Sequence, residues 1–80
     1  MDKLNYRAGS AGHIISSAIL EIIDLPGMWT EHTVLIPYVF KALAKKGSLT
    51  RTADIRIAKV LRDMIKVGLL RKMRGGYVRA

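Results

Sequence analysis

The chain has 80 residues, half of them hydrophobic and none of them cysteine, and its formal net charge is +8. This length fits one domain with a small core, and the lack of cysteine excludes a disulfide scaffold and a thiolate metal site. The excess of 14 basic over 6 acidic residues favours a polyanionic partner. Few residues remain outside such a core, so we expect no catalytic pocket and no enzyme.

Residues 1–9 are mixed in character and end in a glycine, which is typical of a flexible arm, and residues 10–80 are expected to form a single domain. Ser10 can cap a helix, because its hydroxyl can accept an N–H of the first turn. From His13 to Asp24, apolar residues recur at steps of three and four, the periodicity of a helix. The following Pro-Gly pair ends this helix. The apolar stretch of this first helix contains serines and acidic residues and is shorter than the ~20 apolar residues of a membrane span.

Residues 28–32 form a short connector, with a brief strand as the alternative. The next helix is predicted to end at two lysines and Gly47, since cations suit the C-terminal end of a helix and glycine supplies a left-handed cap. Pro37 complicates the start of this helix. Either the helix begins within residues 33–36, or it begins at Thr30 and kinks at the proline.

A tight turn at residues 48–50 leads to a third helix from about Arg51 to Val67, ended by Gly68. Its apolar residues lie on one face and its cations on the other. Residues 1–40 have a net charge of −2, whereas residues 41–80 have a net charge of +10. The polyanion-binding surface is therefore expected in the second half, with a merely solvated basic surface as the alternative.

The chain closes with a hairpin at Gly75-Gly76, because a type I′ turn needs positive φ at both positions. That turn places Arg74 opposite Tyr77 and Met73 opposite Val78. Strand alternation then sorts the side chains between two faces. Those predicted to point inward are Leu69, Met73 and Val78. Those predicted to point outward are Lys72, Arg74, Tyr77 and Arg79.

The segment LAKKGSLTRTADIRIAKVLRDMIKVGLLRKMRGGYVR, which ends at Arg79, resembles the second helix, turn, recognition helix and wing of the winged helix-turn-helix superfamily. Its strongest parts are VLRDMIKVGLL, similar to the end of a recognition helix, and RKMRGGY, similar to a wing. The resemblance implies a mainly α fold of three helices with a small C-terminal β-hairpin. It also implies a sequence-specific, double-stranded DNA-binding transcriptional regulator. We expect the protein to be cytoplasmic, because the sequence shows neither a membrane span nor a signal peptide, and DNA binding would associate it with the nucleoid.

In that superfamily the third helix, here about residues 51–67, enters the major groove, and the wing, here residues 69–80, meets the flanking backbone. The resemblance places residues of the first half of the helix at base edges: Arg51, Thr52, Ile55, Arg56 and Lys59. It gives phosphate contacts to a second set: Lys45, Lys46, Arg62, Lys66, Lys72, Arg74, Tyr77 and Arg79.

Other roles remain open for several of these residues. Arg56 and Lys59 could only solvate an exposed face, and Ile55 could belong to the core. Tyr77 could pack on the hairpin's own Arg74. One of the two threonines that flank Arg51 could serve only as a helix cap.

The apolar residues of the first helix span more than one face, so we expect a homodimer formed mainly through that helix. The predicted interface residues are Ile15, Ile19, Leu20, Ile22 and Ile23. A two-fold dimer would favour a palindromic operator. The alternative is that the small core wraps this helix on most sides.

The sequence predicts no metal site, cofactor, small-molecule ligand or membrane partner. Its two histidines, His13 and His32, are far apart and have no carboxylates at matching spacing, and no phosphate-cradling glycine loop is present. Two other functions remain: a binder of structured RNA or ribonucleoprotein, and a protein-interaction adaptor. Few free aromatic residues argue against single-stranded RNA, and the +10 second half argues against the adaptor.

Overall fold

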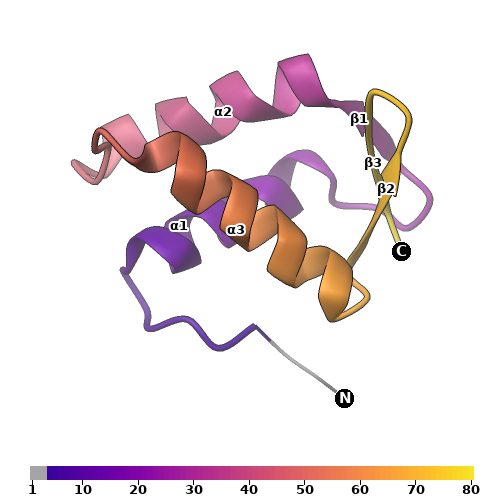
Figure 1. The fold of residues 1–80 in the computed structure, drawn as a ribbon, viewed down its shortest axis with the longest axis horizontal. Helices are drawn as coiled ribbons and strands as arrows, with labels where there is room; N and C mark the ends of the chain where they lie inside the picture. Colours follow the sequence, from indigo (N-terminus) through magenta and orange to yellow (C-terminus); the bar gives the residue numbers. More distant parts are fainter. Residues whose placement is uncertain (1–3) are drawn as a thin grey trace.

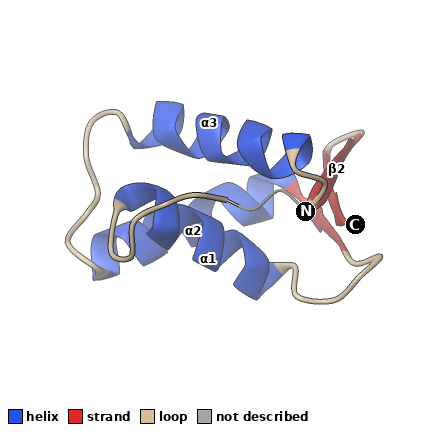
Figure 2. Cartoon of the chain, turned by 90° about the horizontal axis from the view of Figure 1, so that it is seen from below, coloured by secondary structure: helices blue, strands red, loops and turns tan. Residues whose placement is uncertain are grey.

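Three helices and three short strands make up the fold in a computed structural model that describes residues 4–80 (Figure 1). The elements, in chain order, are α1 (Ala11–Ile22), β1 (Trp29–Glu31), α2 (His32–Lys45), α3 (Ala53–Lys66), β2 (Leu70–Met73) and β3 (Gly76–Arg79). α1 packs against both α2 and α3. The strands lie at one end of this helical layer, opposite the α2–α3 connection (Figures 1 and 2). The expected mainly α fold with a C-terminal hairpin is confirmed.

α1 begins where the sequence indicates and ends slightly earlier. The Ser10 hydroxyl accepts the backbone N–H of His13 at 3.2 Å, so the predicted cap is confirmed. The helix ends at Ile22 rather than Asp24. Within residues 4–80, none of the helices combines the length and apolar character needed to cross a bilayer.

The start of α2 is set by the sheet. Strand β1 occupies most of the connector, which confirms the strand alternative, and Glu31 is still extended when α2 begins at His32. The His32 N–H donates to the carbonyl of Gly75 in the hairpin at 2.8 Å. Pro37 therefore lies inside the helix, where it cannot donate to the carbonyl of exposed Thr33.

The three strands form an antiparallel sheet in the order β1-β3-β2. The hairpin turn is Arg74-Gly75, so the predicted Gly75-Gly76 turn is wrong by one residue, and Met73 pairs with Gly76. Of the two glycines, only Gly75 has positive φ, at 75°. Gly76 serves another purpose: a Cβ there would overlap the Thr30 carbonyl oxygen of β1.

The two faces of the hairpin are also exchanged relative to the prediction. This exchange does not follow from the turn, because moving the turn by one residue changes each pairing by two positions and leaves the alternation of side chains intact. Tyr77 points into the core and is 4% exposed, whereas Met73 is 46% exposed. Val78 pairs with Trp29 on the outward side. The predicted outward orientations of Tyr77 and of its partner Lys72, and the inward orientations of Met73 and Val78, are therefore wrong.

The core lies between the three helices and the inner side of the sheet. Its fully buried large side chains come from every layer: Ile15, Ile19, Ile23, Leu35, Val39, Leu43, Ile57, Met64 and Leu70. Leu20 and Ile22 are partly buried and pack against it. Ile15, Ile19 and Ile23 therefore cannot form a dimer surface, and this part of the prediction is wrong. The small core wraps α1, as the alternative expectation stated.

Candidate nucleic-acid interface

The outward side of α3 carries a continuous stripe of exposed residues. Ile55, Lys59, Arg62 and Lys66 recur at steps of three and four, and all four are exposed. The opposite side of α3 is buried in the core. Ile55 is 65% exposed, so it does not belong to the core. We call these four residues the α3 stripe.

The other predicted base-contact residues are exposed but do not all share this stripe. Arg51 and Thr52 precede α3, which begins at Ala53 rather than at Arg51. Thr52 is the N-cap residue, but its side chain makes no cap bond, so the proposed capping by its hydroxyl is not seen. Arg56 lies seven residues before Asp63, hence on the same flank of the helix and beside the stripe.

Two residues of the predicted N-terminal arm, Leu4 and Tyr6, pack against the core, and residues 1–3 of that arm lie outside the described residues. The Tyr6 hydroxyl donates to Asp63 Oδ2 at 2.8 Å. Its ring also lies so close to Gly12 that a Cβ there would come within 2.6 Å of it. The arm thus covers the flank of α3 beside the stripe.

Asp63 joins this arm to the cations of α3. The Lys59 ammonium lies 3.4 Å from Asp63 Oδ2, the one ion pair found within residues 4–80. The hydrogen bond from Tyr6 lowers the pKa of Asp63, and Lys59 and Lys66 lower it further, against the opposing effect of burial. Burial, together with the hydrogen bond and charge of Asp63, raises the pKa of Tyr6 to about 12.

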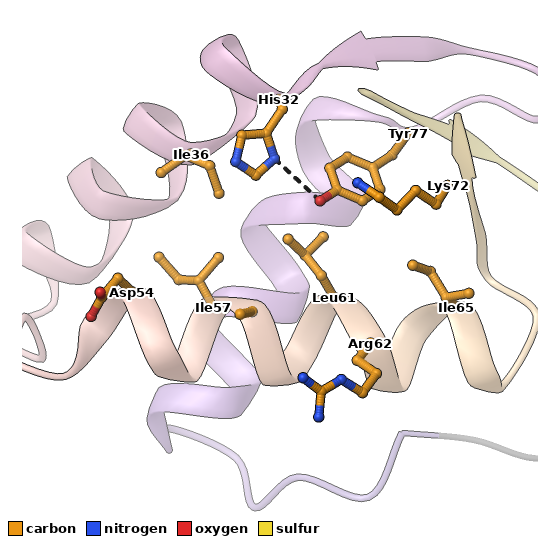
Figure 3. Close-up of a pocket in the computed structure, with 10 residues that line it drawn as sticks. His32, Ile36, Asp54, Ile57, Leu61, Arg62, Ile65, Lys72 and Tyr77 are labelled. Carbon is orange, nitrogen blue, oxygen red and sulfur yellow. Dashed lines mark hydrogen bonds between the residues drawn. The ribbon is translucent and has the colours of Figure 1, made fainter. Parts of the chain in front are cut away.

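A hollow of about 390 Å³ separates α3 from the start of α2 and the hairpin. Its lining is mostly apolar, from residues such as Ile57 and Leu61, and Lys72 reaches it from β2 (Figure 3). The Tyr77 hydroxyl lies 3.2 Å from Nδ1 of His32. The Lys72 ammonium sits 5.3 Å from the centre of the Tyr77 ring, within cation–π range. Burial raises the pKa of Tyr77.

The structure divides the predicted phosphate contacts into three groups. The first group is exposed on α3 and the hairpin: Arg62, Lys66, Lys72 and Arg74. Of these, Arg62 and Lys72 line the hollow. Lys45 and Lys46 are exposed at the end of α2. They line a second hollow beside α1, so the structure does not gather them with the α3 stripe.

Arg79 and Tyr77 form the third group, and both are turned inward. Nη1 of Arg79 donates to the carbonyl of Ile23 at 3.3 Å, and its Nε is buried without a hydrogen-bond partner. The predicted outward orientation of Arg79 is therefore wrong. An exposed cation was also missed: Arg71 of β2. Its position follows from strand alternation once the side of the hairpin that faces the core is known.

Within residues 4–80, no three His, Cys, Asp or Glu side chains are grouped as a metal site would require. Comparison of the chain with family models, with curated proteins and with solved structures finds no match. The chemistry offered by this surface is thus a row of cations around one exposed aliphatic side chain. Such a surface is suited to a polyanion.

Proposed function

We propose that the protein binds double-stranded DNA sequence-specifically, as a winged helix-turn-helix protein and small transcriptional regulator. α3 lies in the major groove, and the β2–β3 hairpin contacts the flanking backbone. The order of elements supports this, because α3 leads directly into a hairpin that packs beside it. A helix has the width that the major groove admits.

The observation that carries the proposal is the α3 stripe. It combines three cations with one exposed aliphatic residue, and within residues 4–80 only Lys59 of these cations has an acidic partner. Ile55 is largely exposed in the monomer, and in the groove it can contact a thymine methyl. Lys72 and Arg74 extend the positive charge from the helix onto the hairpin.

Within this proposal the two ends of α3 have different roles. The residues that reach base edges precede α3 or lie in its first half, the half that enters the groove in helix-turn-helix proteins: Arg51, Thr52, Ile55 and Lys59. Arg56, which lies beside the α3 stripe, also contacts a base edge. The later cations of α3 and those at the turn and inner side of the hairpin contact phosphates: Arg62, Lys66, Lys72 and Arg74.

A salt titration with competitors tests the proposed class of ligand. If about six cations meet phosphates, affinity for duplex DNA should fall by roughly three orders of magnitude between about 50 and 200 mM salt. Duplex DNA should compete better than duplex RNA or heparin. Binding that does not respond to salt would exclude the nucleic-acid proposal, and preference for duplex RNA would replace DNA by a structured RNA.

A pair of arginine variants separates base reading from backbone contact. Arg56→Ala should cost about 1–3 kcal/mol on the preferred sequence and relax specificity, whereas Arg74→Ala should weaken all duplexes by similar factors. Both residues are exposed, so the fold should be retained. The measurement is affinity for a selected and a random duplex at one salt concentration. Identical behaviour of the two variants on both duplexes would contradict this assignment.

A further inference from the structure

The sheet has an outward side that the DNA-binding proposal does not use. Strand pairing places two rows of three residues on it: Glu31, Gly76 and Met73 in one row, and Trp29, Val78 and Arg71 in the other. We call these six residues the outer sheet face. The neighbouring positions Thr30, Tyr77 and Leu70 point the other way and are buried.

This outer sheet face is unusually apolar for the exposed side of so small a sheet. Trp29 is 48% exposed and Met73 is 46% exposed, with the half-buried Val78 on the strand between them. The Trp29 indole lies across Gly76, where a Cβ would come within 2.8 Å of its Nε1. The ring is thus supported by backbone beneath it while half of its surface remains accessible. Such rigid, half-exposed tryptophans are enriched at the centres of protein interfaces.

The charges on this face indicate the chemistry of its partner. It carries one acid, Glu31, and one base, Arg71, at opposite corners of the two rows, so its net charge is zero. The surrounding half of the chain has a net charge of +10. A polyanion would find less attraction here than on α3. The best complement is an apolar surface with one acid and one base at opposite corners, and the outer sheet face itself fits that description.

We propose that a second copy of the chain docks on the outer sheet face. In a two-fold interface each contact occurs twice, so Glu31 of each protomer meets Arg71 of the other. Trp29, Met73 and Val78 then form the apolar centre between the two charge pairs. The Glu31 carboxylate, which accepts a hydrogen bond from the Thr33 hydroxyl, is exposed and accessible to a partner. This interface replaces the α1 interface, whose largest residues lie in the core.

Sedimentation of the free protein tests the dimer without involving DNA, so its outcome is independent of the proposed function. The wild-type protein should shift from 8.9 kDa to twice that mass as its concentration rises through the micromolar range. Trp29 is the single tryptophan of the sequence, so its emission should shift to the blue over the same concentrations. Trp29→Ala should raise the dissociation constant about tenfold or more.

Charge exchange gives the sharper test, because Glu31 and Arg71 are exposed and their replacement should leave the fold intact. Glu31→Arg and Arg71→Glu should each weaken the dimer, and the double variant should restore it. The matched control is Leu49→Ala, which changes an apolar residue of 47% exposure in the α2–α3 connection, at the opposite end of the molecule. It should leave the dissociation constant unchanged.

Three outcomes would overturn the dimer. The first is a wild-type monomer at all concentrations. The second is a dimer that the double variant fails to restore. The third is a dimer that Trp29→Ala leaves unchanged. Under the first outcome, a loss of DNA affinity in Trp29→Ala would assign the outer sheet face to nucleic acid.

Discussion

The surroundings of two arginines, Arg74 and Arg79, decide whether each stabilises the fold or is available to a ligand. Arg74 and Arg79 lie in the same hairpin and were predicted to have the same role, yet only Arg74 is exposed. Arg79 reaches the carbonyl of Ile23 at the C-terminal end of α1, where a cation also suits the helix dipole. The same residue type thus serves stability in one place and is available to a ligand in the other.

We therefore expect Arg79→Ala to lower the free energy of unfolding by about 1–2 kcal/mol, because a charge-assisted hydrogen bond to a helix end is lost. Urea denaturation measures this change. DNA affinity of the folded variant should equal that of the wild type. Arg74→Ala is the matched control and should show the reverse pattern. A large loss of DNA affinity in Arg79→Ala at unchanged stability would show that Arg79 leaves Ile23 to bind phosphate.

At the scale of elements, the N-terminal arm is joined to α3 through one hydrogen bond between two titratable groups. Tyr6 donates to Asp63, and Asp63 also pairs with Lys59 of the α3 stripe. The arm therefore contributes to the position of a proposed DNA-contacting residue. Its attachment depends on the protonation of both partners.

The stability that Tyr6 contributes should be lost in alkali. Its pKa is raised in the folded protein from 10.0 to about 12, so the folded state keeps the proton longer than the unfolded state does. The stabilisation is complete below pH 10 and falls as the pH rises toward about 12. The difference in unfolding free energy between wild type and Tyr6→Phe should shrink over that range.

Acid should also remove the stability that this hydrogen bond contributes, through protonation of Asp63. The pKa of Asp63 is lowered in the folded protein, so its stabilisation is present above the usual aspartate range and disappears as the pH falls through the lowered pKa. Urea denaturation of the wild type and of Tyr6→Phe at a series of pH values measures the loss in acid and the loss in alkali. A difference that stays constant from acid to alkali would contradict the hydrogen bond.

At the scale of the whole molecule, α1 is the centre of the core rather than a surface for association. It packs against both other helices, and its isoleucines at 15, 19 and 23 are fully buried. The apolar residues on more than one face of α1 are buried because α2 and α3 pack against it from two sides. The stability of the monomer therefore depends on α1.

We expect Ile19→Ala to lower the free energy of unfolding by about 2–5 kcal/mol, since it removes buried methyl groups and leaves a cavity. Leu20→Ala, at a partly buried neighbouring position, should cost less. Chemical denaturation at two protein concentrations separates core from interface, because a loss of core stability does not depend on concentration. Unchanged stability of Ile19→Ala with an altered sedimentation mass would restore α1 as a dimer interface.

Some features followed from the sequence because they depend on neighbouring residues. Apolar periodicity predicted α1 and α3, Ser10 predicted a cap, and Gly47 adopts the left-handed conformation expected after α2, with φ of 70°. The cations of the α3 stripe were also predicted, because the same periodicity that buries one side of a helix exposes the other, whereas the side of Ile55 was left open. The concentration of positive charge in the second half is a property of the sequence itself.

Other features were decided only when distant segments met. Both glycines at 75 and 76 fit a turn locally, and the approach of β1 to Gly76 selects the register, since a Cβ there would overlap Thr30. The packing of the hairpin against the helices turns Tyr77 inward and exposes Met73. Likewise, the start of α2 depends on a hydrogen bond from His32 to Gly75. Local preferences leave such choices nearly equal in free energy, and steric exclusion and hydrogen bonding between remote strands settle them.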